Sequence, residues 1–184
     1  MRRLFGIAAG LAICLCAGAA WAGMYEDFTI ICRDTDAASA ASAAAARRLG
    51  FGPSTDPEAK DLAREMPGAL ILERKRGKEN IQLIIGPKRD PKLPGYISDS
   101  CMMLGRGVPG SEARKVRAWL GAPTGSFLGQ AMYVYRLTPS GPVVLKAKTR
   151  GDPAHLKAGE MRSISAGGFM GLATQISFAR IRPE

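Results

Sequence analysis

Apolar and polar residues alternate over several short stretches of the chain, with the period of two that is typical of half-buried strands. The clearest case is the closing stretch 172–181, where leucine, isoleucine and phenylalanine alternate with small or polar residues. We predict strands over 25–32, 96–104, 132–137, 143–147 and 172–181, and a hairpin that pairs 69–75 with 79–85 around Arg76-Gly77. The segments 132–137 and 143–147 flank a Pro-Ser-Gly-Pro turn and form a second predicted hairpin.

A long alanine-rich segment predicts the first main helix. Residues 36–49 follow Asp34 and Thr35, either of which can cap a helix, and Gly50 ends the segment. One amphipathic face of this helix would consist of Ala38, Ala41, Ala45 and Leu49. We expect these small side chains to bring the helix close to the sheet.

Two further helices and the hairpins set the expected fold class. A short helix starts at Pro57 and ends before Pro67, and a second main helix covers 112–120 after Ser111. We therefore predict an α+β fold, an antiparallel sheet of hairpins with two main helices packed on one face. The order of strand, helix and hairpin occurs over 25–86 and again over 96–147, which suggests two half-repeats. The alternative is that this order is a common unit and that the halves are unrelated.

The N-terminal segment has the pattern of an export peptide. Met1-Arg2-Arg3 is a cationic head, residues 4–20 are apolar, and Ala20-Trp21-Ala22 is a small-x-small cleavage signal. We expect residues 1–22 to be cleaved, which leaves 23–184 as one domain in the periplasm or outside the cell, without a stable transmembrane anchor. The rival interpretation is a retained anchor, although the glycines in the apolar stretch weaken it. Arg2-Arg3 also resembles the twin-arginine export pattern, so the export route stays open.

Cysteine use agrees with this compartment. Cys14 and Cys16 lie in the leader, so the mature chain retains Cys32 and Cys101. Two cysteines in an oxidising compartment most simply form one disulfide. A redox role favours a Cys-x-x-Cys pair, and a structural zinc site needs four ligands where the mature chain offers these two cysteines and one histidine. We therefore expect neither a metal nor a cofactor.

The mature chain is basic. Loss of Arg2 and Arg3 lowers Lys+Arg from 26 to 24 against 16 Asp+Glu, which gives a net charge of about +8. Such a charge favours encounter with anionic partners, although it is also typical of an ordinary soluble surface. The candidate anion-binding residues are Arg74, Lys75, Arg76, Lys78, Arg106 and Arg114. We expect the partner to be an envelope protein or an anionic surface of lipid head groups or polysaccharide. Specific nucleic-acid binding is not expected, because aromatic residues do not alternate with these cations.

One segment matches a nucleotide-binding motif literally. Residues 105–110 read Gly-Arg-Gly-Val-Pro-Gly between a predicted strand and a predicted helix. However, no acidic residue occurs between Glu112 and Asp152, so the carboxylate that would bind a ribose is missing. We interpret the segment as a flexible glycine loop. The alternative is that the amides at the start of the following helix, with Arg106 and Arg114, hold a phosphate or sulfate.

Candidate catalytic residues are sparse, and we assign none. His155 is the only histidine and follows Asp152 by three residues, which we interpret as a solvated loop rather than a general base with its orienting group. The G-x-S-x-G motif of serine hydrolases does not occur. The sequence therefore favours an exported binding or interaction module. The alternatives are a secreted hydrolase with a site assembled from scattered residues and a structural envelope component.

Overall fold

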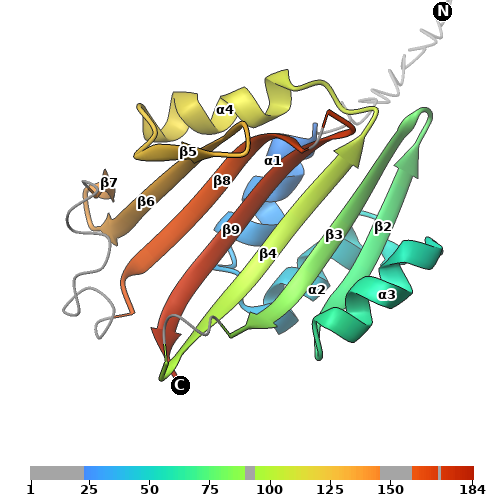
Figure 1. Ribbon diagram of the computed structural model, residues 1–184, viewed down its shortest axis with the longest axis horizontal. Coiled ribbons are helices and arrows are strands. Elements are labelled where there is room, and N and C mark those ends of the chain that lie inside the picture. Colours follow the sequence, from blue (N-terminus) through green and yellow to red (C-terminus); the bar gives the residue numbers. More distant parts are fainter. Residues whose placement is uncertain (1–22, 90–93, 146–158, 170) are drawn as a thin grey trace, which may run out of the picture.

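The structure is a computed structural model that describes residues 23–89, 94–145, 159–169 and 171–184. Nine strands form one antiparallel sheet in the order β1-β2-β3-β4-β9-β8-β6-β5, and β7 pairs with β6 (Figure 1). The strands are β1 (Gly52–Pro53), β2 (Leu70–Arg76), β3 (Glu79–Lys88), β4 (Tyr96–Arg106), β5 (Gly125–Phe127), β6 (Gln130–Thr138), β7 (Gly141–Val144), β8 (Met161–Phe169) and β9 (Ala173–Pro183). The predicted α+β class and antiparallel sheet are confirmed.

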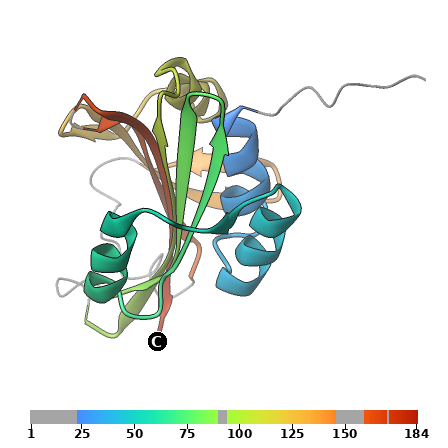
Figure 2. The same cartoon turned by 90° about the vertical axis from the view of Figure 1, so that its right-hand side faces the viewer.

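The helices are α1 (Met24–Phe28), the π-helical turn η1 (Thr29–Arg33), α2 (Ser39–Arg48), α3 (Pro57–Glu65) and α4 (Ser111–Leu120). Within the described ranges, no helix is both long enough and apolar enough to cross a membrane. Side chains of α1, η1, α2 and α4 share one buried cluster with the sheet, so these helices cover the same face, which we call the covered face. Figure 2 shows α3 on the opposite side of the sheet from α1 and α2, and we call that side the open face.

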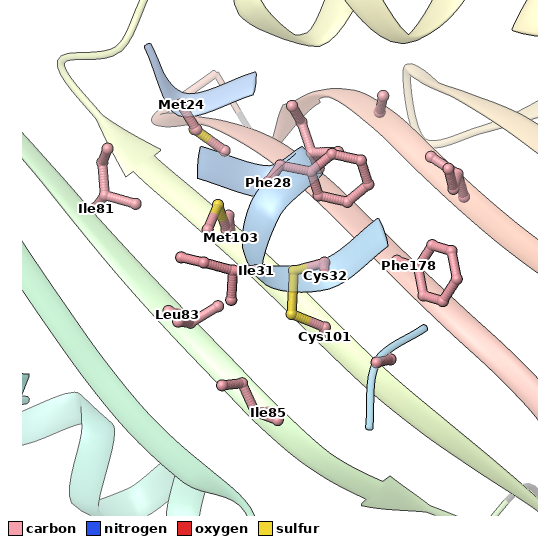
Figure 3. Close-up of a cluster of buried hydrophobic side chains, with 14 of the residues drawn as sticks. Met24, Phe28, Ile31, Cys32, Ile81, Leu83, Ile85, Cys101, Met103 and Phe178 are labelled. Carbon is pink, nitrogen blue, oxygen red and sulfur yellow. A yellow bond between two sulfur atoms is a disulfide. The ribbon is translucent and has the colours of Figure 1, made fainter. Parts of the chain in front are cut away.

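Alternate residues of the central strands fill the space beneath the helices. Five side chains of β3 and β4 that point to the covered face are at most 1% exposed. These side chains are Ile81, Leu83, Ile85, Cys101 and Met103. Met24, Phe28 and Ile31 pack onto them from the helical side (Figure 3). The core therefore lies between the first helical segment and β3 and β4.

The strand predicted over 25–32 is wrong, because this segment is helical in α1 and η1. Its aromatic and β-branched residues favour a strand by composition. However, Met24, Phe28 and Ile31 recur at the spacing of one helix face, and each is at most 1% exposed. A carboxylate oxygen of Glu112 on α4 also accepts a hydrogen bond of 2.8 Å from the N–H of Tyr25, in the first turn of α1. The helical spacing of the buried residues and this contact with α4 outweigh the strand-favouring composition, so the segment forms a helix.

The alanine-rich helix forms, but its buried face differs from the prediction. Ser42, Ala43, Ala45 and Ala46 are buried, whereas Ala41 is exposed. The helix begins at Ser39 rather than at residue 36, and the hydroxyl groups of Thr35 and Ser42 lie 2.7 Å apart in a hydrogen bond. Gly50 ends the segment with a φ of 83°, as predicted for a left-handed cap. Because six of the ten residues of the helix are alanine, composition alone does not select the stripe that faces the sheet.

The two predicted hairpins form, but their loops are shorter or shifted: they consist of residues 77–78 and 139–140, because Arg76 pairs with Glu79 and Thr138 pairs with Gly141. The structure also adds strands that the sequence analysis did not find. The most central of these is β8, which pairs with both β6 and β9. A Cβ atom added at Gly167 would lie 2.9 Å from the Cα of Gln130, so glycine allows β8 and β6 to approach each other. Gly167 lowers the strand propensity of β8 but is required for its close packing with β6.

The first helical segment ends in an unusual turn at Asp36. The N–H of Asp36 donates to the carbonyl of Arg33, and the N–H of Ala37 donates to the carbonyl of Cys32, which is the Schellman pattern. Asp36 has a φ of 54°, in the left-handed region that glycine usually occupies there. Its carboxylate accepts hydrogen bonds from the Arg162 guanidinium, one of them 2.7 Å long. The ion pair ties the end of the helical segment to β8.

A disulfide joins the same helical segment to the middle of the sheet. Cys32 lies on η1 and Cys101 on β4, with their Cα atoms 5.5 Å apart and both side chains fully buried (Figure 3). Only the second cysteine therefore lies on a strand. The first of the two expected halves begins with a helix and the second with a strand, and the relation between the halves stays a prediction.

We predict that the double substitution Cys32→Ala with Cys101→Ala lowers the free energy of unfolding by about 4 kcal/mol. The bond closes a loop over a sequence separation of 69, and its loss restores conformational freedom to the unfolded chain. Urea denaturation of the natural and substituted proteins measures the difference, and the natural protein under reducing conditions provides the control. A loss of less than about 1 kcal/mol would contradict the prediction.

Candidate functional site

A hollow extends along the open face of the sheet. It consists of two adjoining cavities of about 470 and 490 Å³, which share Met102. The first lies over β3, β4, β9 and β8 and includes Lys88 and Tyr96, and the second lies between α3 and the beginning of β9 and includes Arg106 and Leu172. Volumes of this size are typical of small-molecule sites.

The hollow exists because small side chains occupy the open face of β9 and β8. Successive strand residues point to opposite faces, so the core residues Ile176 and Phe178 place Ser177 and Ala179 on the open face. Larger apolar side chains border these small ones at the edges of the first cavity. They are Ile84, Met102, Met132 and Ile181. The floor of the hollow is therefore lined by small and apolar residues.

Several polar side chains of this floor form hydrogen bonds with each other or with the backbone. The hydroxyl groups of Ser165 and Ser177 lie 2.7 Å apart, and Ser100 donates to the carbonyl of Gly86 at 2.9 Å. The side-chain amide of Gln130 donates to the Gln175 side chain at 3.0 Å, and both residues are buried. Because these groups already have a partner, covering them with an apolar group costs less free energy than covering unpaired polar groups.

One end of the hollow carries polar groups that are free. Lys88 and Ser98 are register partners on β3 and β4, and Ser163 lines the same cavity from β8. Within the described ranges, the ammonium group of Lys88 has no ion-pair partner and the hydroxyls of Ser98 and Ser163 have no hydrogen bond. The neighbouring Arg89 pairs with Glu184 at 3.1 Å. This end therefore offers a cation and two hydroxyl groups.

The other end of the hollow is acidic. Arg106 pairs with Asp56 at 3.4 Å and with Glu58 at 2.8 Å, and Asp61 pairs with Arg64 at 2.8 Å. Glu65 also lines this cavity. Carboxylates outnumber cations here, so the two ends of the hollow have opposite charge.

The loop before α3 is held by Glu73 of β2. Its carboxylate accepts hydrogen bonds from the hydroxyls of Ser54 at 3.0 Å and Thr55 at 2.6 Å. Asp56 then caps α3, since its side chain accepts the N–H of Glu58 at 3.0 Å. The bond from Thr55, with the other donors around the carboxylate, lowers the pKa of Glu73 to about 2. Glu73 therefore positions the helix that borders the acidic end.

The structure places the three guanidinium groups of Arg74, Arg76 and Arg106 in ion pairs. Arg74 binds the carboxylate of Asp27, whose side chain is fully buried, and donates to the carbonyl of Leu49 at 2.9 Å. Arg76 pairs with Glu79 at 2.6 Å, and Arg106 pairs with the acidic residues before and within α3. These guanidinium groups already have anionic partners within the fold, so they contribute less to an external anion site than their sequence clustering suggests.

The other three candidates are more accessible. The Lys75 ammonium lies 3.4 Å from the Glu73 carboxylate with its side chain 62% exposed. Lys78 and Arg114 are exposed and form no ion pair with the described residues. Asn80 pairs with Arg106, so the β2–β3 turn that carries Lys78 lies at the same end of the sheet as Arg106. The loop after β4 leads from this end into α4, which carries Arg114. Anion binding by this set stays a prediction.

Two of the three glycines of the motif at 105–110, Gly105 and Gly107, have packing roles. A Cβ atom at Gly107 would lie 2.6 Å from the carbonyl oxygen of Lys78, and Gly107 has a φ of 74°. A Cβ atom at Gly105 would lie 2.7 Å from the sulfur of Met24. The first turn of the next helix contains Glu112, whose carboxylate binds the N–H of Tyr25. Close contacts of the β2–β3 turn and α1 therefore account for these glycines.

The hollow itself was missed by sequence reasoning. The alternation of small residues with isoleucine and phenylalanine on β9 could have indicated it, but we used this alternation only to predict a strand. The leader at 1–22 and the pair Asp152 and His155 lie outside the described residues. Among the residues that the structure covers, no group of three His, Cys, Asp or Glu side chains could hold a metal ion. No protein-family model, curated protein or solved structure matches the chain.

We predict that Glu73→Gln lowers the free energy of unfolding at pH 7 by up to about 3 kcal/mol. The pKa of Glu73 is lowered from 4.5 to about 2 on folding, so its stabilisation is fully present above about pH 4.5 and is lost as the pH falls to about 2. Urea denaturation over this pH range should give curves for the two proteins that differ at neutral pH and converge near pH 2. If the free energies of unfolding of the two proteins differed by the same amount at every pH, the carboxylate would not be stabilised by its hydrogen-bond donors.

Proposed function

We propose that this chain is an exported binding protein of the periplasm or extracellular space, and that the hollow on its open face holds an amphiphile with an apolar chain and an anionic head group. The hollow is the observation that carries the proposal, because its floor is apolar or internally hydrogen-bonded. A long-chain fatty acid or a lysophospholipid has this chemistry. The ligand would thus belong to the anionic lipid class expected from the basic composition.

The middle of the hollow supports an apolar chain. Ile84, Met102 and Met132 offer apolar contact, and removal of apolar area from water stabilises by about 25 cal/mol per Å². Methionine side chains are flexible and polarisable, so they fit chains of different shape. The serines and glutamines of the floor that are hydrogen-bonded to each other cost less to cover with an apolar chain than unpaired polar groups would.

The two ends of the hollow give the ligand a direction. Lys88, Ser98 and Ser163 can donate to a carboxylate or phosphate, and a hydrogen bond to a charged group is stronger than one between neutral groups. The carboxylates at the α3 end repel the same head group. We therefore expect the head group beside Lys88 and the apolar chain directed toward Met102.

We also propose that the chain consists of two half-repeats, with α2 and α4 as the two main helices on one face. Each helix ends at a Leu-Gly pair, and the two glycines, Gly50 and Gly121, have φ values of 83° and 78°. A hairpin follows each helix, β2 with β3 and β6 with β7. This similarity supports the repeat, although the segments that precede the helices differ.

We predict that Ala179→Phe weakens the binding of a fluorescent long-chain fatty acid by about tenfold or more, because the ring occupies the apolar floor that the chain would cover. The side chain of Ala179 makes no hydrogen bond, so the substitution removes none. Ala118→Phe on the exposed side of α4 is the matched control and should bind like the natural protein. Fluorescence titration, with an unlabelled fatty acid as competitor, measures the affinity.

Lys88→Gln tests the head group separately. This variant should lose affinity for the fatty acid and keep its affinity for the corresponding neutral alcohol. A natural protein that binds no amphiphile contradicts the proposal, and specific capture of an envelope protein would then favour the interaction-module alternative. Turnover of an esterified ligand would favour a secreted hydrolase. The absence of both binding and turnover would favour a structural envelope component.

A further inference from the structure

The most exposed large hydrophobic side chains of the described residues lie on two turns. Leu128 is 78% exposed, Leu172 is 77% exposed and Phe127 is 65% exposed. Phe127 and Leu128 lie at the turn between β5 and β6, and Leu172 lies at the turn between β8 and β9. Single exposed hydrophobic residues are common on protein surfaces, whereas a group of them indicates a contact surface.

The strand register places both turns at the same end of the sheet. Gln130, at the start of β6, pairs with Gly167 near the end of β8, and Gly167 pairs with Gln175 near the start of β9. In Figure 1 the tip of the β8–β9 hairpin lies at the end of the sheet where β4 leads into α4. In Figure 2 the ends of these hairpins project together beyond the sheet. We call this end, with Phe127, Leu128 and Leu172, the apolar tip.

Leu128 occupies a turn position that does not suit leucine. Phe127 pairs with Gln130, so the hairpin loop consists of Leu128 and Gly129, which have φ values of 47° and 79°. Positive φ at both residues is the type I′ turn, where asparagine, aspartate or glycine is preferred at the first position. Leucine at 128 is thus unfavourable for the backbone and gains almost no burial in return. Neither folding nor solubility explains it, which indicates a contact made outside the free protein.

The beginning of the domain lies at the same end. Gly105 of β4 packs against Met24, the first residue of α1, and pairs with Thr174, two residues after Leu172. The apolar stretch of the leader ends at residue 20, so a chain emerging from the membrane during export has this end nearest to the bilayer. Lys78 and Arg114, which form no ion pair with the described residues, lie at this end as well and can contact anionic head groups. The carboxylates of Asp56 and Glu58 at this end are paired with Arg106.

We propose that the apolar tip docks the protein onto a phospholipid bilayer, with Phe127, Leu128 and Leu172 inserted among the lipid chains. Insertion removes these side chains from water, which provides the stabilisation that the free protein lacks. Leu172 also lines the second cavity of the hollow, so docking brings one end of the hollow to the membrane surface. Docking rests on the turns alone and does not require a ligand in the hollow.

Vesicle flotation of the exported protein tests this proposal, after intact mass has shown that the chain starts at residue 23. The vesicles contain phosphatidylethanolamine and phosphatidylglycerol. Leu128→Asn should lower the partition coefficient by about tenfold, the loss expected for one leucine side chain that no longer enters the membrane. The melting temperature of this variant should equal or exceed that of the natural protein, because Asn-Gly suits the turn. Reduced binding together with unchanged or higher stability supports membrane docking.

Leu137→Asn is the matched control. Leu137 is 48% exposed and pairs with Pro142, in the hairpin at the other end of β6, so vesicle binding should not change. Leu172→Ser provides a second tip variant and should also bind more weakly. Equal vesicle binding by the natural protein and both tip variants overturns the proposal. Sedimentation that shows a dimer of the natural protein in the absence of lipid, lost in Leu128→Asn, overturns it in favour of self-association. Fatty-acid binding is measured separately, so failure of docking leaves the hollow to be judged on its own titration.

Discussion

The packing of the first helical segment against β3 and β4 is the contact on which the rest of the structure depends. Met24, Phe28 and Ile31 are buried there, and the disulfide and the Asp27–Arg74 ion pair fix the segment to the sheet from two sides. α4 joins the same core through Ala113, Val116 and Leu120. Once these helices occupy one face, α3 at the β2 side is the one helix that the described residues place on the opposite face. The sheet therefore has to make its other face compatible with solvent or with a ligand, and the paired serines and glutamines of the hollow meet that requirement.

Local signals in the sequence predicted most of the sheet and the helix ends. Gly50, Gly77 and Pro57 carry their own backbone constraints, so the turns and helix limits that depend on them could be read directly. The structure of segment 25–32 could not be predicted in this way, because its composition favours a strand. Its apolar residues also have helical spacing, but only their burial against β3 and β4 shows that this spacing determines the structure. β8 was missed for the opposite reason. Its glycines and serines lower strand propensity, and the need for Gly167 comes from the close approach of β6, which is a property of the neighbouring strand rather than of β8 itself.

The candidate site was harder to predict, because charge pairing and face selection depend on residues far apart in the chain. Arg74 belongs to a dense cluster of cations in the sequence, yet its partner Asp27 lies 47 positions away. The same is true of Arg106, whose partners lie in and before α3. A run of cations therefore overstates the free positive charge of the folded surface. Predicting the open face needs more information still. The alternation along β9 predicts that the strand has two different faces, but it does not predict which of them the helices leave uncovered.

Among the described residues, three residues other than glycine adopt a positive φ. Their surroundings distinguish a structural role of this backbone conformation from a functional one. Asp36 is bound through its carboxylate to Arg162, and Ala37 is fully buried with its N–H bonded to Cys32. In both cases the fold itself offsets an unfavourable backbone conformation, and the segment they end is part of the core. Leu128 has the same kind of backbone, but its side chain lies almost entirely in solvent. The described residues form no contact that buries the Leu128 side chain, and this difference from Asp36 and Ala37 is the observation behind the proposed docking of the apolar tip.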